Sequence, residues 1–66
     1  MHMSTTTAIK IIVLHKNDGT LKRYMSSFVP RIGESIEINA QRYRIEDVVW
    51  CPDMLHVRLH VDDLKN

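Results

Sequence analysis

The sequence is poor in cysteine, glycine, proline and aromatic residues, and these shortages exclude several classes of protein. It holds one Cys, two Gly, two Pro, one Trp, two Tyr and one Phe among 66 residues. The single thiol, Cys51, excludes an intrachain disulfide and fits a reducing compartment, so we expect a cytoplasmic protein. The formal net charge of only +1 excludes the strong positive field of a dedicated phosphate-backbone binder.

Long apolar runs are also missing. The longest uninterrupted one covers residues 11–14, whereas a helix that spans a bilayer needs roughly 20 apolar residues. No signal-peptide pattern precedes it, and the opening Met1-His2-Met3 is typical of a cloning remnant. We therefore expect a soluble protein with no membrane partner, and these three residues carry no functional argument.

The length of 66 residues allows one hydrophobic core and one domain. We expect a disordered tail with the cloning remnant at residues 1–7, a single β-barrel domain at 8–61, and a C-terminal tail at 62–66. A domain this small buries only roughly 60% of the surface that its unfolded chain exposes. Small domains of this kind usually need a disulfide, a metal or a partner subunit. Self-association into a homo-oligomer is therefore expected.

Strand patterns dominate the sequence. Residues 8–16 are β-branched and apolar on both faces, which predicts a strand that is central or covered on both sides. The Asn-Asp-Gly-Thr turn at 17–20 predicts a hairpin onto residues 21–28, and a loop punctuated by Pro30 and Gly33 follows. Further elements are expected at 35–38 (strand), 39–41 (tight turn with Asn39 left-handed), 42–50 (strand) and 55–61 (strand).

The strand at 42–50 changes phase halfway along. Tyr43 and Ile45 lie on one side and Val48 and Trp50 on the other, with the change at Glu46-Asp47. Because side chains alternate with a period of two, all four face one core only if an extra residue is inserted as a β-bulge. The expected partners are Leu55 for Trp50, Val57 for Val48, Leu59 for Ile45 and Val61 for Tyr43. Bulges bend sheets, so we predict an all-β fold, a small five-stranded antiparallel meander curled into a barrel with the bulge in its fourth strand.

Three segments carry a resemblance. They are Val-Pro-Arg-Ile-Gly-Glu-Ser-Ile-Glu-Ile at 29–38, Tyr-Arg-Ile at 43–45 and Asp-Val-Val-Trp at 47–50. Together they resemble small uncharacterised bacterial and phage proteins that share a Pro-x-Ile-Gly-Glu loop, a short strand, a tight turn and a long strand. Such proteins are similar to SH3-like small barrels. The resemblance covers roughly half of the chain and implies a fold, and it brings no functional residues because many unrelated functions use such barrels.

The last strand carries a candidate basic face. Its members are Arg42, Arg44, His56, Arg58 and His60. His60 is expected opposite Arg44, which extends the stripe across two strands. One interpretation is a nucleic-acid-binding surface, because small barrels often combine such a stripe with exposed aromatic residues. The other is a solvated ladder of ion pairs in which Glu46 and Asp47 face Arg58.

No cofactor, resident metal or catalytic constellation is expected. His56 and His60 lie about 13 Å apart at roughly 3.3 Å per strand residue, too far for one ion to bind both rings. The remaining metal interpretation needs a ligand from another strand or chain, and His15 and Cys51 show no zinc spacing. Gly-rich phosphate loops, nucleophile elbows and paired-carboxylate spacings are missing from the sequence. We therefore expect a protein that is not an enzyme.

The remaining function classes are binding functions. We predict a small non-enzymatic binding module that acts as a protein-interaction accessory factor of bacterial or phage origin, with nucleic-acid binding through the basic face as the alternative. The apolar residues Met25, Trp50 and Met54 lie near strand ends and are the interface candidates.

Overall fold

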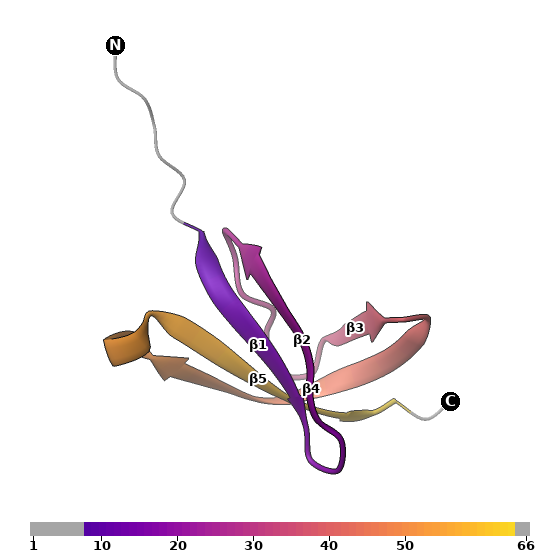
Figure 1. The fold of residues 1–66 in the computed structure, drawn as a ribbon. Helices are drawn as coiled ribbons and strands as arrows, with labels where there is room; N and C mark the ends of the chain where they lie inside the picture. The colour runs from indigo at the N-terminus through magenta and orange to yellow at the C-terminus, as the bar shows by residue number, and fades with distance from the viewer. Residues whose placement is uncertain (1–7, 65–66) are drawn as a thin grey trace.

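The computed structural model describes residues 8–64, which form five β-strands and one short 3-10 helix (Figure 1). The all-β prediction is therefore confirmed. The elements are β1 (Ile9–His15), β2 (Gly19–Ser26), β3 (Ser35–Ile38), β4 (Gln41–Cys51), η1 (Pro52–Met54) and β5 (His56–Asp63). The described part of the chain contains no helix long and apolar enough to cross a membrane. The tail predicted at 1–7 lies outside the described residues.

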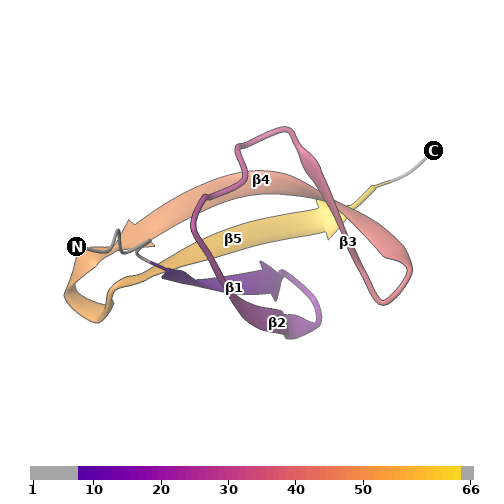
Figure 2. The same cartoon turned by 90° about the horizontal axis from the view of Figure 1, so that it is seen from above.

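The strands form one curled sheet, a half-barrel, in the order β2-β1-β5-β4-β3 (Figures 1 and 2). The prediction of a purely antiparallel sheet is wrong, because β1 and β5 pair in parallel. In a meander with an odd number of strands, the first and last strands run in the same direction. When curling brings them together they therefore pair in parallel. The half-barrel is left open between β2 and β3, the strands at the two edges of the sheet.

The bulge predicted in the fourth strand is confirmed. Ile45 pairs with Val61 and Asp47 with His60, so Glu46 has no partner of its own on β5. The predicted register is wrong by two residues, because Trp50 pairs with Val57 and not with Leu55. The four-residue turn lies one residue later than expected, at 52–55 instead of 51–54: η1 occupies Pro52–Met54 and Leu55 follows at φ 53°. A shift of two keeps every side chain on its predicted face.

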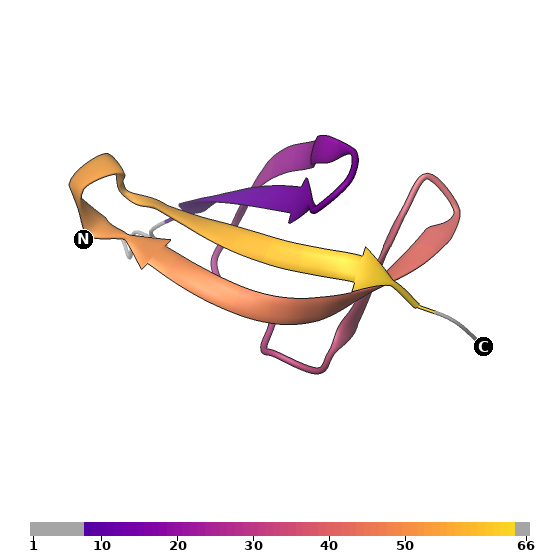
Figure 3. The same ribbon diagram turned by 90° about the horizontal axis from the view of Figure 1, so that it is seen from below.

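The concave face of the half-barrel holds the core. Seven apolar residues are buried there, namely Ile11, Val13, Tyr43, Ile45, Val57, Leu59 and Val61. β4 and β5 run as a long curved ribbon beside β1 (Figure 3). These three adjacent strands provide the buried residues of the core. Trp50 shares the parity of Val48, as predicted, but its side chain is 58% exposed because it lies near the end of β4.

The connection between β2 and β3 crosses the sheet and is fastened to β4 (Figure 2). The Gly33 N–H donates to the Ile45 carbonyl at 2.8 Å, and the Ile45 N–H donates to the Glu34 carbonyl at 2.9 Å. Glu34 also accepts the Arg31 N–H on its carboxylate at 2.7 Å. Gly33 takes φ 93°, a conformation that L side chains rarely adopt. These bonds explain the Pro-x-Ile-Gly-Glu pattern as a structural turn.

The structure defines two predicted boundaries, the turn after β3 and the end of β5. The tight turn after β3 is confirmed, with Asn39 at φ 53° and Ala40 also left-handed at φ 67°. β5 continues to Asp63, two residues beyond the predicted domain end at 61. The extra residues are ordered because Asp62 and Asp63 pair with Arg44 and Tyr43 of β4.

Candidate functional site

The predicted basic face has acidic neighbours across the strands. Arg42 lies opposite Glu37, Arg44 opposite Asp62, His60 opposite Asp47 and Arg58 opposite Val49. The expected pairing of Arg44 with His60 and the expected contact of Arg58 with Glu46 and Asp47 are therefore wrong, by the same two-residue register shift. Positive and negative side chains alternate over this face, so it does not form a continuous basic stripe.

Two members of the basic face are engaged by the fold. His56 is buried, and it lies between Lys10 of β1 and Cys51 of β4. The Arg58 guanidinium donates to the Cys51 sulfur at 3.2 Å. Within residues 8–64 the ion pairs involve His15 and Lys16 and not these arginines. Nucleic-acid binding through this face stays a prediction, and it would depend on the exposed Arg42 and Arg44 more than on His56.

The sequence did not predict the side-chain cluster around His15. This histidine ends β1 and is only 4% exposed. Its Nδ1 accepts the backbone N–H groups of Asn17 at 3.2 Å and Asp18 at 3.3 Å. Its Nε2 therefore carries the ring proton of the neutral form and donates to Asp63 at 3.1 Å. Its ring also packs edge-on against Tyr43, with centroids 5.8 Å apart.

The same cluster has the ligand types of a metal site, since His15, Asp62 and Asp63 bring one ligand atom each within 4.8 Å of one another. The hydrogen bonds argue against that use. A cation on Nε2 would need the proton on Nδ1, where two backbone N–H groups already point. The cluster is instead a structural link that ties the ends of the parallel strands β1 and β5 together.

Lys16 extends this link to Asp62. Its ammonium donates to the Asp62 carboxylate at 3.1 Å. This hydrogen bond, with one from the Asp63 backbone N–H, holds the pKa of Asp62 below its usual value. The charged carboxylate is thus favoured by folding.

Exposed apolar side chains gather where β4 ends and η1 begins. A hollow of about 270 Å³ is lined there by Ile9, Trp50, Pro52 and Leu55, with Ala8, Cys51 and His56. A second hollow of about 400 Å³ runs from Trp50 to Ile32 and the loop at 29–31. We call Ile9, Ile32, Trp50, Pro52 and Leu55 the Trp50 surface. The indole belongs to both hollows and joins them into one apolar region.

The interface candidates fall into two places. Trp50 belongs to this surface, and Met54 adjoins it in η1 with a side chain that is 72% exposed. Leu55, which the sequence placed in the core, is instead 80% exposed. Met25 lies on β2 opposite Lys10, outside the set that lines either hollow.

Comparison of this chain with protein-family models, with curated proteins and with solved structures finds no match to it.

Proposed function

We propose that this chain is a small non-enzymatic module that binds a protein partner through the Trp50 surface. The observation that carries the proposal is the contiguous exposure of large apolar side chains at one end of the sheet. Soluble domains rarely expose contiguous apolar patches without a use, and larger ones mark interaction sites. The proposal includes cytoplasmic location and an accessory role in bacteria or their phages.

The composition of the surface supports a protein partner over a small molecule. Trp50 is the only tryptophan of the chain, and tryptophan is enriched among residues that dominate binding energy. Apolar residues make up most of the lining of both hollows, with Arg31 in one and His56 in the other. Aromatic residues are enriched and charged residues are depleted at the centre of protein interfaces.

Kinship with the SH3-like small barrels is part of the same proposal. The curled five-stranded sheet and the turn at Gly33 support it. The kinship adds no binding residues, so the function rests on the Trp50 surface alone.

The test is affinity purification from a lysate of the source organism with three baits: wild type, Trp50→Ala and Met25→Ala. Met25 is the matched control, because its side chain is also exposed, at 59%, but lies on β2 away from the Trp50 surface. We expect one or a few proteins to be enriched with wild type and Met25→Ala and lost with Trp50→Ala. Circular dichroism checks that each variant folds.

A direct binding measurement then separates a specific partner from a protein that binds any exposed apolar surface. Because the chain has a single Trp, its own emission reports on Trp50, and the emission of the partner measured by itself is subtracted. The purified partner should shift the emission to shorter wavelength as the indole leaves water. A partner that binds all three baits equally, or that leaves the emission unchanged, would remove the Trp50 surface from the proposed function.

A further inference from the structure

The two edges of the half-barrel are free within the described residues. β2 (Gly19–Ser26) pairs only with β1, and β3 (Ser35–Ile38) pairs only with β4. An edge strand presents unpaired N–H and C=O groups, which can pair with a strand of another chain. In this chain the two edges lie beside one another, on either side of one groove.

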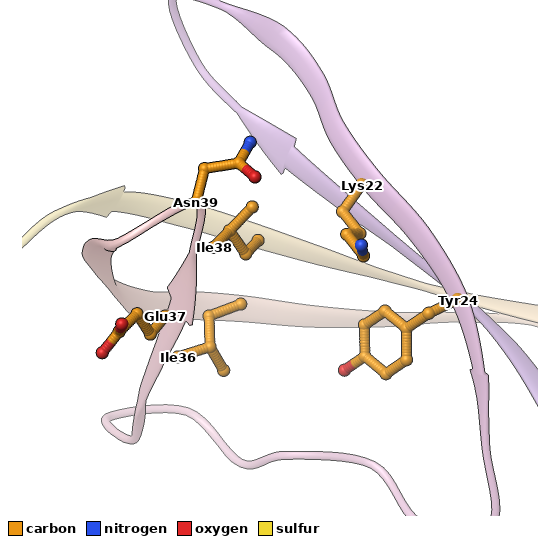
Figure 4. Close-up of a pocket in the computed structure, with 6 residues that line it drawn as sticks. All are labelled: Lys22, Tyr24, Ile36, Glu37, Ile38 and Asn39. Atoms are coloured by element: carbon orange, nitrogen blue, oxygen red, sulfur yellow. The ribbon is translucent and has the colours of Figure 1, made fainter.

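An apolar groove of about 360 Å³ separates the edges (Figure 4). Tyr24 projects into it from β2, and Ile36 and Ile38 project into it from β3. All three side chains are half-buried, and burial raises the pKa of the Tyr24 phenol above its usual value. The groove is therefore lined by side chains that already belong to the margin of the core.

The two edges carry opposite charges on their outer faces. Arg23 lies on β2 opposite Ile12, and Glu37 lies on β3 opposite Arg42. In an antiparallel pairing of β2 with β3, placing Arg23 opposite Glu37 also places Tyr24 opposite Ile36 and Lys22 opposite Ile38. One register thus places Arg23 opposite Glu37 outside and Tyr24 opposite Ile36 inside, and it lays the Lys22 side chain beside Ile38. Glu37 would then lie between two guanidinium groups, Arg42 of its own copy and Arg23 of the other.

The strand directions favour the same arrangement. β2 is antiparallel to β1, β1 is parallel to β5, and β3 runs in the direction of β5 because both pair antiparallel with β4. β2 and β3 therefore run in opposite directions. A two-fold axis along the strands keeps these directions, so β2 of one copy meets β3 of another in antiparallel orientation.

We propose that two copies of this chain form a closed dimer in which β2 of each copy pairs with β3 of the other, with Arg23 opposite Glu37. The pairing is reciprocal, so every free edge is used and assembly ends at two copies. It supplies the β2–β3 contact that a five-stranded meander would make within one barrel. It involves neither the Trp50 surface nor its partner.

The test is charge reversal and rescue, read by sedimentation velocity over a range from low micromolar to millimolar protein. Wild type should be a dimer. Arg23→Glu and Glu37→Arg, each alone, should raise the dimer dissociation constant by about tenfold or more, because both copies lose an attractive pair and gain a repulsive one. The double variant R23E/E37R should recover much of the wild-type affinity.

A matched control and a second measurement keep the outcome clear. Lys10→Glu reverses an exposed charge on β1, away from both edges, and should leave the dimer intact. Hydrogen exchange should slow at the β2 and β3 amides as concentration rises. A wild-type monomer, or singles that associate like wild type, would overturn the proposal, and so would growth beyond two copies. A monomer would also leave the groove open to an extended peptide of another protein. These results are independent of the Trp50→Ala experiment.

Discussion

Deletion of Glu46 removes the residue of β4 that is left unpaired between Ile45 and Asp47 in the ladder with β5. Without it, the two halves of β4 fall into a single alternating phase. Tyr43 and Ile45, which are buried in the core, then share one face with Val48 and Trp50, and both halves of β4 keep their partners on β5 in a regular ladder. The bend that the bulge gives to the strand is lost. The deletion tests whether the bulge is required or is an accommodation that the strand can lose.

The expected cost is limited because no core side chain changes face. Tyr43 and Ile45 stay buried, and Ile45 keeps the hydrogen bonds that fasten Gly33 and Glu34 to it. The loss is confined to the bend of β4, which the rest of the sheet must absorb. Single changes cost about 0.5 to 3 kcal/mol, whereas the net stability of a 66-residue domain is on the order of 3 to 10 kcal/mol. We expect the deletion variant to be folded and less stable than wild type.

The assay is urea unfolding followed by circular dichroism, with a heteronuclear NMR spectrum as the test of folding. Glu46→Ala is the matched control, because it keeps the bulge and removes only an exposed side chain, and it should unfold within about 0.5 kcal/mol of wild type. A deletion variant without dispersed resonances would refute the reasoning, because the bulge would then be required for folding and not only for the bend of β4.

Three further predictions use other parts of the sheet. Ala40→Gly should stabilise the fold by about 0.5 to 1 kcal/mol in urea unfolding, because a left-handed Ala costs about 1 to 2 kcal/mol and glycine returns part of that gain as entropy of the unfolded chain; a lower midpoint would contradict it. Asp62 has a lowered pKa in the fold, so its contribution to stability is complete above the unfolded pKa near pH 4 and is lost as the pH falls through the folded pKa. Lys16→Met should therefore flatten the decline of urea midpoints below about pH 4, and an unchanged acid profile would exclude that role. If the basic face binds nucleic acid, a mixed single-stranded oligonucleotide at low salt should shift amide resonances at Arg44 and Arg58, and Arg44→Ala with Arg58→Ala should weaken binding; no shift on that face removes the idea.

The bulge was predictable because it follows from the alternation of apolar and polar residues within a single strand. Tyr43 and Ile45 have one phase and Val48 and Trp50 the other, and only one inserted residue reconciles them. The register of β4 with β5 was not, because the position of the turn depends on Leu55 taking a positive φ, and a leucine in an alternating pattern carries no turn signal. The predicted register was wrong by two residues, which is an even number. Each side chain was therefore assigned to the correct face of the sheet but to the wrong cross-strand partner.

The His15 cluster could not be predicted for a different reason. Its partner Asp63 lies 48 positions along the chain, and the two meet only because β1 and β5 pair in parallel. That pairing depends on how far the sheet curls, which is a property of the whole strand set and is not encoded in any short spacing. A histidine at the end of an apolar strand was the only available signal.

The order of the strands also determines when the domain can form. β5 is the middle strand of the sheet and lies between the β1–β2 hairpin and the β3–β4 hairpin, so each hairpin lacks its main support until residues 56–63 exist. A two-stranded hairpin by itself is at best marginally stable in water. During synthesis, Ile11 and Val13 must therefore remain without their final neighbours Val57 and Leu59 until residues 56–63 have left the ribosome. A product that stops before His56 would contain two hairpins without the strand that pairs with both of them, and each hairpin would have an apolar face turned to solvent.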